Sequence, residues 1–456
     1  MANPNFKSGT VWTGDNLHVM RGINSECVDL IYLDPPFNSN RMYKAPIGSI
    51  AAGAAFKDMW TLDDVDVYEH GELAERSPAA HDVIKAARTC HGKGMMSYLI
   101  FMAVRLIEMK RILKPSGSIW LHCDDAAGHY LKLLMDGIFG KDNYQNEITW
   151  ERVKGAGKRG GNEPQNFGRS TDRLFFYTGT DPHTFNYKAV SKPYPNFKRR
   201  FNRVDEKGRY YRRSPFRPPG LGPAPNLCYE YKGVFPPHVS GWLMTKANLE
   251  LLENSGNLEW ENGKPYKKQR PGSGILPNNC WTDINIPGRK ESTKYPTQKP
   301  LALLERIIKA SSNEGDMVFD PFCGCATTLV SADRLNRQWA GADLSSLAIK
   351  LVNERIADER GLWGGAIALD TPPRRTDLGK LPNYRTNAHR LYGEQEGICV
   401  GCDTHFPFRI MEVDHKIPRA KGGTDHPDNL QLLCSHCNRS KGGKTMAEWR
   451  AYKDRA

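Results

Sequence analysis

Short apolar runs alternate with stretches of helical periodicity through the first 360 residues of the chain. Val28–Leu33 is an apolar, β-branched run that ends at Asp34-Pro35-Pro36-Phe37, which predicts a buried strand followed by a rigid loop. Apolar residues recur at helical spacing from Met95 to Leu113, and a turn at Lys114–Gly117 leads into a second apolar run, Ser118–His122. This alternation predicts an α/β domain built on a parallel sheet.

The same pattern resumes late in the chain. Met317–Asp320 predicts a strand, Leu329–Leu335 a helix, and Trp339–Ala342 another strand that ends in Asp343. The turn between the first of these strands and the helix consists of small residues, which let a cofactor approach the backbone at the carboxyl end of the sheet. Asp343 can then accept both ribose hydroxyls of a nucleoside cofactor. A single glycine-containing turn is weak evidence unless a second site accompanies it.

Two regions interrupt or end this pattern. Residues 38–94 contain Gly/Ala-rich and acidic pieces and are predicted to form an insertion. Residues 361–392 include Pro372-Pro373-Arg374-Arg375 and show little apolar periodicity, which predicts a linker between a domain of residues 1–360 and one of residues 393–456. A chain of 456 residues is long enough for two domains at least.

The charge balance favours a polyanionic partner. Lys and Arg total 64 against 51 Asp and Glu, a net charge of +13. Residues 188–220 alone carry eleven Lys or Arg against two acids, interleaved with aromatic residues. Basic groups neutralise phosphates while aromatic rings stack on bases, so we expect this segment to contact double-stranded DNA. Within this segment, we expect Arg199, Arg200, Arg212 and Arg213 to contribute to DNA binding. The alternative is a solvated loop.

Composition also limits the compartment. The chain has no run of about 18 apolar residues, and its first residues lack an apolar signal segment, which predicts a cytoplasmic protein that does not enter a membrane. Seven of the 11 cysteines are scattered and irregular, as is typical of a reducing compartment. The oligomeric state stays open, with a homodimer as one alternative.

The last sixty residues contain two Cys-x-x-Cys pairs. Four thiolates at such spacing can surround one structural Zn²⁺ ion, and the residues concerned are Cys399, Cys402, Cys434 and Cys437. Zinc explains the cysteines but not Asp414-His415 between the pairs, nor Asn429 and Asn438 further along. Phosphodiester hydrolysis needs a base to deprotonate water and a hard cation to hold the phosphate, and these residue types could supply both.

The polar positions resemble the HNH (ββα-metal) endonucleases, in the variant whose third motif residue is Asn. The resemblance implies that His415 is the base, that Asn429 orients it, and that Asp414 with Asn438 holds one Mg²⁺-like ion through oxygen ligands. The alternative is a zinc module that binds DNA without cutting it.

The large domain carries a second resemblance. Asp34-Pro35-Pro36-Phe37 resembles the D-P-P-Y/F motif of DNA amino methyltransferases, and Asp320–Thr328 resembles their D-P-F-x-G-S-G-T-T cofactor loop. The similarity continues through Gly14-Asp15-Asn16, Tyr295–Pro300 and Gly341–Asp343, and the order of the motifs is that of the beta class. Two positions depart from the loop pattern, because Ala326 replaces its second glycine and Cys325 its serine. Both are small, so we expect the cofactor to bind.

This resemblance implies a Rossmann-like sheet that binds S-adenosylmethionine, with a DNA-recognition region inserted at about residues 150–290. The cofactor-binding residues that it implies are Asp15, Lys299, Asp320, Phe322, Gly324, Thr327 and Asp343. Asp34, Pro35, Pro36 and Phe37 are the implied catalytic residues. His122-Cys123-Asp124-Asp125, after its strand, is interpreted as a set of polar residues at the sheet end near the active cleft.

The chemistry at Asp34 follows from the target. An exocyclic amine is a poor nucleophile and is paired inside the duplex, so the base has to be flipped out. Asp34 can accept a hydrogen bond from the amine, a carbonyl of the Pro-Pro turn can accept another, and Phe37 offers a stacking face. Asp at the first motif position favours adenine N6 by resemblance. The sequence therefore predicts an adenine-N6 methyltransferase fused to an HNH nuclease, in a restriction-modification or phage role. The alternative is a cytosine-N4 enzyme whose zinc module only binds DNA.

Overall fold

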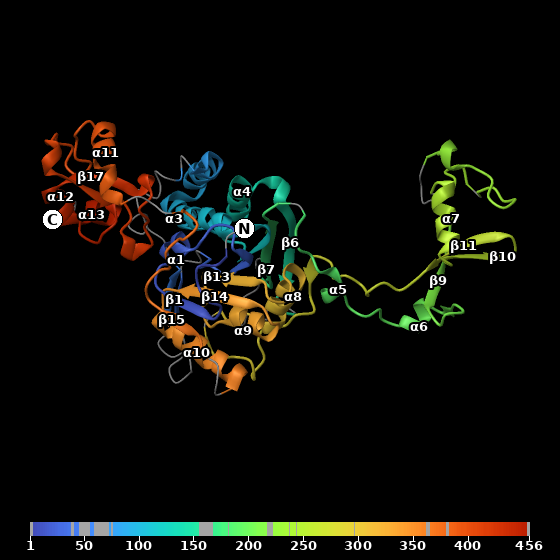
Figure 1. The fold of residues 1–456 in the computed structure, drawn as a ribbon. Coiled ribbons are helices and arrows are strands. Elements are labelled where there is room, and N and C mark those ends of the chain that lie inside the picture. The colour runs from blue at the N-terminus through green and yellow to red at the C-terminus, as the bar shows by residue number, and fades with distance from the viewer. Residues whose placement is uncertain are drawn as a thin grey trace. The chain divides into compact units, whose positions relative to one another are not determined.

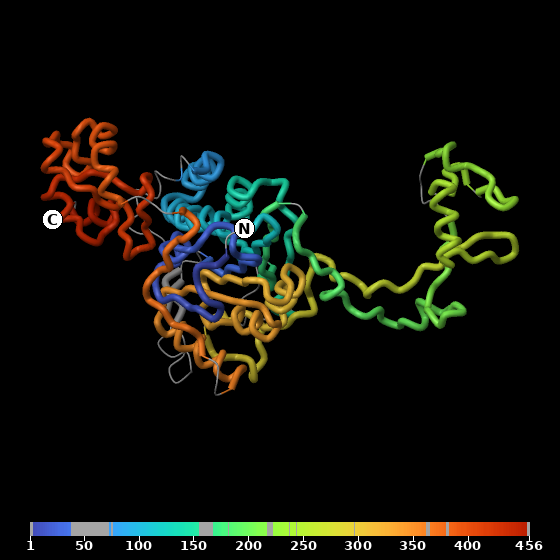
Figure 2. Tube along the Cα trace, viewed as in Figure 1, coloured from blue at the N-terminus to red at the C-terminus, as the bar shows by residue number. Residues whose placement is uncertain are grey.

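The computed structural model describes residues 3–37, 41–44, 55–58, 73, 76–154, 167–180, 182–216, 222–236, 238–242, 244–295, 297–361, 365–379 and 383–453. The chain divides into two compact units (Figure 1). Unit 1 comprises Met1–Asn186 and Asn278–Ala456, and unit 2 comprises Tyr187–Pro277. Figure 2 traces the chain through both units, with unit 2 in green to yellow.

Unit 1 is built on a large twisted sheet. Among the described residues its strand order is β12-β6-β7-β5-β2-β13-β14-β1-β15. The strands are β1 (Thr10–Thr13), β2 (Val28–Leu33), β5 (Leu113–Cys123), β6 (Tyr144–Glu151), β7 (Thr171–Thr178), β12 (Cys280–Trp281), β13 (Met317–Asp320), β14 (Gln338–Asp343) and β15 (Ile367–Leu369). From β5 to β15 all neighbours are parallel, whereas β7 runs antiparallel to both β5 and β6. The predicted α/β architecture is confirmed, with one reversed strand that apolar patterning did not indicate.

Helices cover both faces of this sheet (Figure 1). Along β2, Ile31 and Leu33 pack into the cluster formed with α3 (Pro78–Ile112) and α4 (Gly128–Phe139), whereas Leu30 and Tyr32 pack into the cluster formed with α8 (Leu301–Ser311) and α9 (Thr327–Arg334). Alternate side chains of a strand point to opposite faces, so a strand buried on both faces has to be continuously apolar. This is why the short apolar runs predicted strands.

The helices of unit 1 follow the periodicity of the sequence. Their bounds are α1 (Asn16–Gly22), α3 (Pro78–Ile112), α4 (Gly128–Phe139), α8 (Leu301–Ser311), α9 (Thr327–Arg334) and α10 (Ser346–Arg360), and β3 (Arg41–Lys44) pairs with β4 (Ala55–Asp58). The helix predicted from Met95 extends back to Pro78 across a kink at Gly92, where φ is 81°. Most of the predicted insertion at residues 38–94 lies outside the described residues. No helix in the described part of the chain is both long and apolar enough to cross a bilayer.

The predicted turn at Lys114–Gly117 is instead part of a strand. β5 runs without interruption from Leu113 to Cys123, and its pairing with β2 shifts register there, from Val28↔Leu113 to Leu30↔Ser118. The extra residues are accommodated as a bulge, which bends the strand without ending it. Pro and Gly in this stretch therefore marked a break in pairing and not the end of an element.

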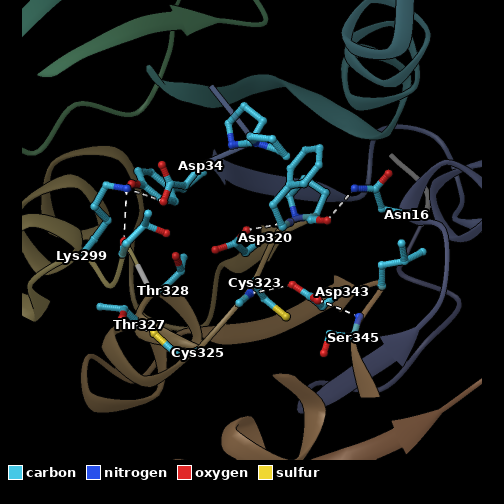
Figure 3. Close-up of a pocket in the computed structure, with 18 of the residues that line it drawn as sticks. Asn16, Asp34, Lys299, Asp320, Cys323, Cys325, Thr327, Thr328, Asp343 and Ser345 are labelled. Carbon is cyan, nitrogen blue, oxygen red and sulfur yellow. Dashed lines mark hydrogen bonds and ion pairs between the residues drawn. The ribbon is translucent and has the colours of Figure 1, made fainter. Parts of the chain in front are cut away.

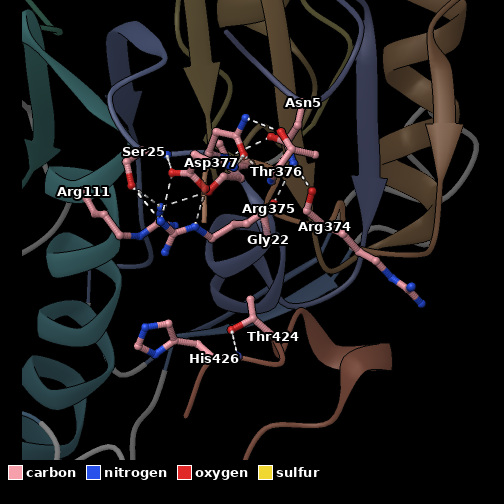
Figure 4. Close-up of polar contacts among 12 residues, drawn as sticks. Asn5, Gly22, Ser25, Arg111, Arg374, Arg375, Thr376, Asp377, Thr424 and His426 are labelled. Carbon is pink, nitrogen blue, oxygen red and sulfur yellow. Dashed lines mark hydrogen bonds and ion pairs between the residues drawn. The ribbon is translucent and has the colours of Figure 1, made fainter. Parts of the chain in front are cut away.

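The predicted linker is ordered at both of its ends. β15 adds to the sheet edge beside β1, and Leu391 in α11 (Ala388–Glu394) joins the apolar cluster of the C-terminal residues. Between them, the main-chain carbonyl of Arg374 accepts a hydrogen bond from Asn5 Nδ2 at 2.6 Å, and Asp377 Oδ2 accepts one from the Ser25 amide at 2.8 Å (Figure 4). The sequence predicted a free linker because its apolar periodicity is low. Hydrogen bonds such as these leave no hydrophobic pattern in a sequence, so they could not be predicted from it.

Unit 2 has its own small core. Four strands pair in the order β10-β11-β9-β8, namely β8 (Arg203–Val204), β9 (Tyr210–Pro215), β10 (Leu258–Glu261) and β11 (Lys264–Gln269). Its helices are α5 (Tyr187–Val190), α6 (Phe197–Arg200) and α7 (Lys246–Asn254). Phe216, Trp242 and Leu249 form the centre of its apolar cluster. The flanks of the predicted recognition region, 150–290, differ from unit 2, since β6, β7 and β12 belong to the large sheet.

The C-terminal residues fold as two strands and helices. β16 (Met411–His415) pairs antiparallel with β17 (Leu430–Cys434), and α12 (Ser435–Lys441) and α13 (Met446–Lys453) follow. Trp449 is buried among Leu432, Leu433 and the cysteines. The ββα order that the sequence predicted is present, and it places the two polar strand ends and the start of α12 in one small domain.

Candidate functional sites

A cavity of about 670 Å³ opens at the carboxyl edge of the large sheet (Figure 3). Three of its parallel strands end there in acidic residues or lead directly into them, with Asp34 after β2, Asp320 at the end of β13 and Asp343 at the end of β14. All the predicted catalytic residues of the large domain line this cavity, together with every predicted cofactor-binding residue: Asp34, Pro35, Pro36, Phe37, Asp15, Lys299, Asp320, Phe322, Gly324, Thr327 and Asp343.

Asp343 is held by the loops around it. Its Oδ2 accepts a hydrogen bond from the Gly324 amide and its Oδ1 one from the Ser345 amide, both at 2.9 Å. Each carboxylate oxygen has a second acceptor site, so both remain able to accept a hydroxyl from a ribose. Burial raises the pKa of Asp343 above its usual range, although these backbone bonds oppose that effect.

Glycine is required under this loop. A Cβ at Gly341 would lie 3.0 Å from Leu329 and 3.1 Å from Cys323, and Gly324 itself has a φ of +46°. Ala326 adopts the left-handed conformation, with φ 67° and ψ 22°, at the N-cap of α9. The loop therefore takes a left-handed turn at the position where its family pattern has glycine, at a cost of roughly 1–2 kcal/mol for a residue with a Cβ.

Asp320 is almost fully buried at the cavity floor. Its Oδ1 accepts the Phe322 amide at 2.9 Å. Burial, with smaller contributions from the Asp34 and Asp343 carboxylates, raises the pKa of Asp320 to about 7. Burial makes ionisation of the Asp320 carboxyl costly. A cationic ligand bound nearby would favour the ionised carboxylate and offset that cost.

Asp15 and Asn16 close one side of the cavity. Asp15 Oδ1 caps α1 through the Leu17 amide at 2.9 Å, and it pairs with Arg105 at 2.8 Å. Asn16 donates to the Pro321 carbonyl at 2.7 Å and accepts from Arg105 Nε at 2.7 Å. Burial opposes ionisation of Asp15, yet Arg105 keeps its pKa below the usual range.

Sequence reasoning missed Arg105. It lies in the middle of α3, where the apolar periodicity predicted only core, and its guanidinium carbon sits 3.5 Å from the centre of the Phe101 ring. The available signal was a cation in the middle of a run of buried apolar residues, since such a group needs a partner.

Asp34 contacts Lys299, which lines the cavity beside it (Figure 3). Lys299 Nζ lies 2.5 Å from Asp34 Oδ2. Asp34 Oδ1 is buried, and it has no hydrogen-bond partner within the described part of the chain. Lys299 was predicted to bind the cofactor, but in the structure its ammonium group is bonded to the carboxylate of the D-P-P-F motif.

Behind the motif lies a buried polar chain that the sequence did not assign. Tyr32 Oη and His122 Nδ1 are 2.9 Å apart, and His122 Nε2 is 3.2 Å from Asp172 Oδ2. Burial raises the pKa of Tyr32 well above its usual range, so the phenol stays protonated and donates to Nδ1. His122 is then the Nε2–H tautomer donating to Asp172, and its ring stacks on Phe37 at a centroid distance of 5.9 Å.

The four C-terminal cysteines are assembled. The thiol sulfurs of Cys399, Cys402, Cys434 and Cys437 all lie within 4.8 Å of one another, and Cys402 alone is exposed. Within the residues that the structure describes, this is the one group of three or more His, Cys, Asp or Glu side chains close enough to share an ion. Four thiolates in a small domain fit Zn²⁺.

His415 is oriented by a residue that the sequence did not indicate. Its Nε2 lies 2.8 Å from Asp425 Oδ1, and Asp425 is also paired with Arg419. Asn429, predicted to orient the ring, instead accepts from the Ile417 amide at 2.9 Å and donates to the carbonyls of Ile417 and Thr424. Asn429 therefore fixes the loop that carries Asp425.

The predicted Mg²⁺ pair is not assembled. Asp414 pairs with the ammonium of Lys441 at 3.0 Å and accepts from Gln431 at 2.9 Å, whereas Asn438 donates to Glu412 at 2.5 Å. Lys441 is completely buried and needs a counter-charge, which Asp414 provides. In this arrangement the two residues do not fit Mg²⁺.

The fold and the cavity define a nucleoside-cofactor-binding α/β enzyme domain followed by a small four-cysteine ββα domain. The model of the DNA methylase family matches residues 28–354, and that of the HNH endonuclease family matches residues 399–444. The chain belongs to the N6/N4 DNA methylase family and carries a C-terminal HNH endonuclease domain.

Curated relatives agree with this assignment. The chain is 30% identical over 361 residues to the type II methyltransferase M.EcaI of Enterobacter cloacae, covering 78% of this chain and 70% of that protein. It is 28% identical to the Mod subunit of the type III restriction-modification enzyme StyLTI of Salmonella typhimurium, covering 76% of this chain and 54% of that one. A solved PvuII DNA methyltransferase (cytosine-N4-specific) is similar over 81% of this chain and 97% of its own, at 13% identity and a TM-score of 0.37.

Proposed function

We propose that this chain methylates adenine N6 at a specific site in double-stranded DNA and that its HNH domain cleaves DNA, as parts of one restriction-modification activity. The methylation proposal rests on a carboxylate oxygen of Asp34 that is unpaired among the described residues. Its Oδ1 is buried at the cavity wall with no hydrogen-bond partner in the described part of the chain. An unsatisfied buried acceptor costs about 1–3 kcal/mol, which a substrate donor placed there would recover.

The residues of the cavity divide into two groups in this mechanism. Asp343 would accept the ribose hydroxyls of S-adenosylmethionine, and Asp320 would supply a negative charge for its cationic part. Three acidic side chains, Asp15, Asp320 and Asp343, and the apolar wall of Phe322 and Leu344 are a donor set that fits a cationic nucleoside. When bound, S-adenosylmethionine would supply an electrophilic methyl group on a sulfonium, and the S–CH3 bond would break with its electron pair left on sulfur as a neutral thioether.

Asp34 acts on the other reactant. The flipped base stacks on Phe37, and its amine donates one hydrogen bond to Asp34 Oδ1 and one to a main-chain carbonyl of Pro35 or Pro36. These acceptors draw the nitrogen toward sp³ geometry, so that its lone pair is available for methyl transfer. The substituted amine then loses a proton, for which Asp34 is the adjacent acceptor.

The preference for adenine is supported by Asp at the first motif position, which is the residue that resembles the adenine-specific enzymes. Sequencing of modified bases in DNA from cells that express the chain tests this proposal. N6-methyladenine in one sequence context is expected. N4-methylcytosine would correct the base, and unmodified DNA would contradict the methylation proposal.

The nuclease part rests on His415. Asp425 accepts the Nε2 proton, which leaves Nδ1 as the acceptor for a water proton. The four cysteines would hold Zn²⁺ as a structural ion, which would stabilise this domain. Plasmid nicking by the full-length protein, compared with its His415→Ala variant, tests whether the domain cuts DNA.

Each part of the chain has its own role in this proposal. Residues 1–360 form the methyltransferase domain and residues 393–456 the nuclease domain, with the segment 361–392 between them. Unit 2 is the DNA-recognition part. It carries the exposed cations Lys198, Arg199 and Arg200 on α6, beside the aromatic side chains of Tyr194 and Phe197.

A further inference from the structure

Lys299 and Asp34 lie 265 residues apart in the chain, and their side chains are bonded to each other in the lining of the cavity. Lys299 immediately precedes Pro300, the N-cap of α8, and Asp34 directly follows β2. Their side chains are 8% and 18% exposed. A lysine that is nearly buried needs a partner. Lys299 bonds to only one of the two carboxylate oxygens of Asp34, Oδ2.

The same ammonium group contacts both polar and aromatic parts of the D-P-P-F motif. Lys299 Nζ bonds to Asp34 Oδ2 at 2.5 Å and lies 5.2 Å from the centre of the Phe37 ring. It also approaches the Thr297 carbonyl at 3.4 Å, which fixes it from its own loop. With Oδ2 occupied, the carboxylate plane is set and Oδ1 is the oxygen left for another donor.

We propose that Lys299 is a positioning residue for methyl transfer: it fixes Asp34 through Oδ2 so that Oδ1 faces the exocyclic amine, and it holds the Phe37 ring against the flipped base. This inference rests on the function proposed above. It assigns Lys299 to the target base and not to the cofactor. A misplacement of a catalytic group by about 1 Å can cost on the order of 100-fold in rate, so a positioning role is measurable.

The test uses the full-length protein, tritiated S-adenosylmethionine and unmethylated bacterial genomic DNA. Lys299→Met removes the charge and the bond but keeps much of the side-chain volume. We expect the single-turnover rate at saturating substrates to fall by about 100-fold, whereas the Kd for S-adenosylmethionine stays within about threefold. Lys299→Arg, which retains charge and donors, should recover at least a tenth of the wild-type rate.

Lys309 provides a matched control. It lies on α8, the helix that begins just after Lys299, and pairs with Glu305 at 3.1 Å. Lys309→Met should leave both rate and affinity unchanged. A Lys299→Met protein that loses S-adenosylmethionine affinity by tenfold or more, or one that transfers methyl at the wild-type rate, would overturn the inference.

A double-substitution cycle separates positioning from simple loss of folding. Lys299→Met leaves an unpaired buried carboxylate and should lower the melting temperature, but in an Asp34→Asn background the same change should have little effect. Equal destabilisation in both backgrounds would show that Lys299 stabilises the fold independently of Asp34. An Asp34→Asn protein that still methylates DNA would contradict the proposed function itself, whatever the result at Lys299.

Discussion

Arg213 of unit 2 is paired with Glu259 across two strands, with Nη2 and Oε1 2.5 Å apart. Glu261 binds the same guanidinium. Arg203 also lies against Glu259, at 3.4 Å. A basic segment in the sequence is therefore partly neutralised by acids that come from β10, about 50 residues further along.

This pairing divides the cations of residues 188–220 into two groups. Arg199 and Arg200 are exposed and make no ion pair among the described residues, whereas Arg213 is committed to internal partners. Replacing Arg199 and Arg200 together by Ala should lower the log-log salt slope of DNA binding by up to about 2, since each phosphate contact contributes about 0.9. Fluorescence anisotropy over a salt series measures this slope.

Arg213→Ala is the matched control for that experiment. It should leave the salt slope unchanged and lower the melting temperature of the protein, because Glu259 and Glu261 lose their shared partner. If the slope falls with Arg213→Ala and not with the Arg199 and Arg200 changes, the division drawn from the ion pairs is wrong.

Asp34 and Asp343 should separate transfer from cofactor binding. Asp34→Asn is expected to abolish methyl transfer while the Kd for S-adenosylmethionine stays within a few-fold, because the partner proposed for Asp34 is the target base and not the cofactor. Asp343→Ala should raise that Kd by tenfold or more, because the variant could not form the charged hydrogen bonds proposed between Asp343 and the ribose. Isothermal titration gives the affinities and methyl incorporation gives the rates. Loss of cofactor binding in a folded Asp34→Asn protein would reverse these roles.

Cofactor binding should depend on pH through Asp320. The pKa of this buried carboxyl is raised to about 7 by burial and by nearby acids. A cationic ligand requires the ionised form, so affinity for S-adenosylmethionine should fall by up to tenfold for each pH unit below about 7 and level off above it. Asp320→Asn should bind more weakly at pH 8 and show a flat profile. An unchanged slope in the variant would exclude Asp320 as the cause.

Asp320 should also make the stability of the folded protein depend on pH. Folding raises the pKa of Asp320 from its ordinary 3.8, so the folded protein holds this proton more tightly than the unfolded chain. Its contribution to stability is therefore full below about pH 4 and is lost as pH rises to about 7. Asp320→Asn should raise the melting temperature of the cofactor-free protein at pH 8 and have little effect at pH 4. Differential scanning fluorimetry measures both.

In the C-terminal domain, zinc content and cleavage should respond to different residues. Cys437→Ser should lose zinc and the compact fold, because the energy of binding at a structural site is folding energy. His415→Ala should keep its zinc and lose plasmid nicking, and Asp425→Asn should reduce nicking while the metal content stays intact. Metal analysis and a nicking assay with Mg²⁺ or Mn²⁺ in the buffer distinguish them. Wild-type nicking by His415→Ala would remove the nuclease assignment.

The sequence by itself determined the strands around Asp34, Asp320 and Asp343, because residues buried on both faces of a parallel sheet leave a continuous apolar run. It also indicated the cysteine cluster, since each Cys-x-x-Cys pair is local and two such pairs supply four thiolates. These features depend on neighbours a few positions away. The candidate cavity was predictable to the same extent, because the carboxyl ends of parallel strands meet at one edge.

The tertiary structure alone decided which side chains meet. Lys299 with Asp34, Arg105 with Asp15, Asp425 with His415 and Lys441 with Asp414 are polar pairs that no periodicity records. Burial makes each of these pairs necessary, since a charge removed from water requires a partner, but the partner comes from wherever the chain passes. The roles that the sequence predicted for Lys299, Asn429 and Asp414 depend on such partners, so they could be assessed only in the folded chain.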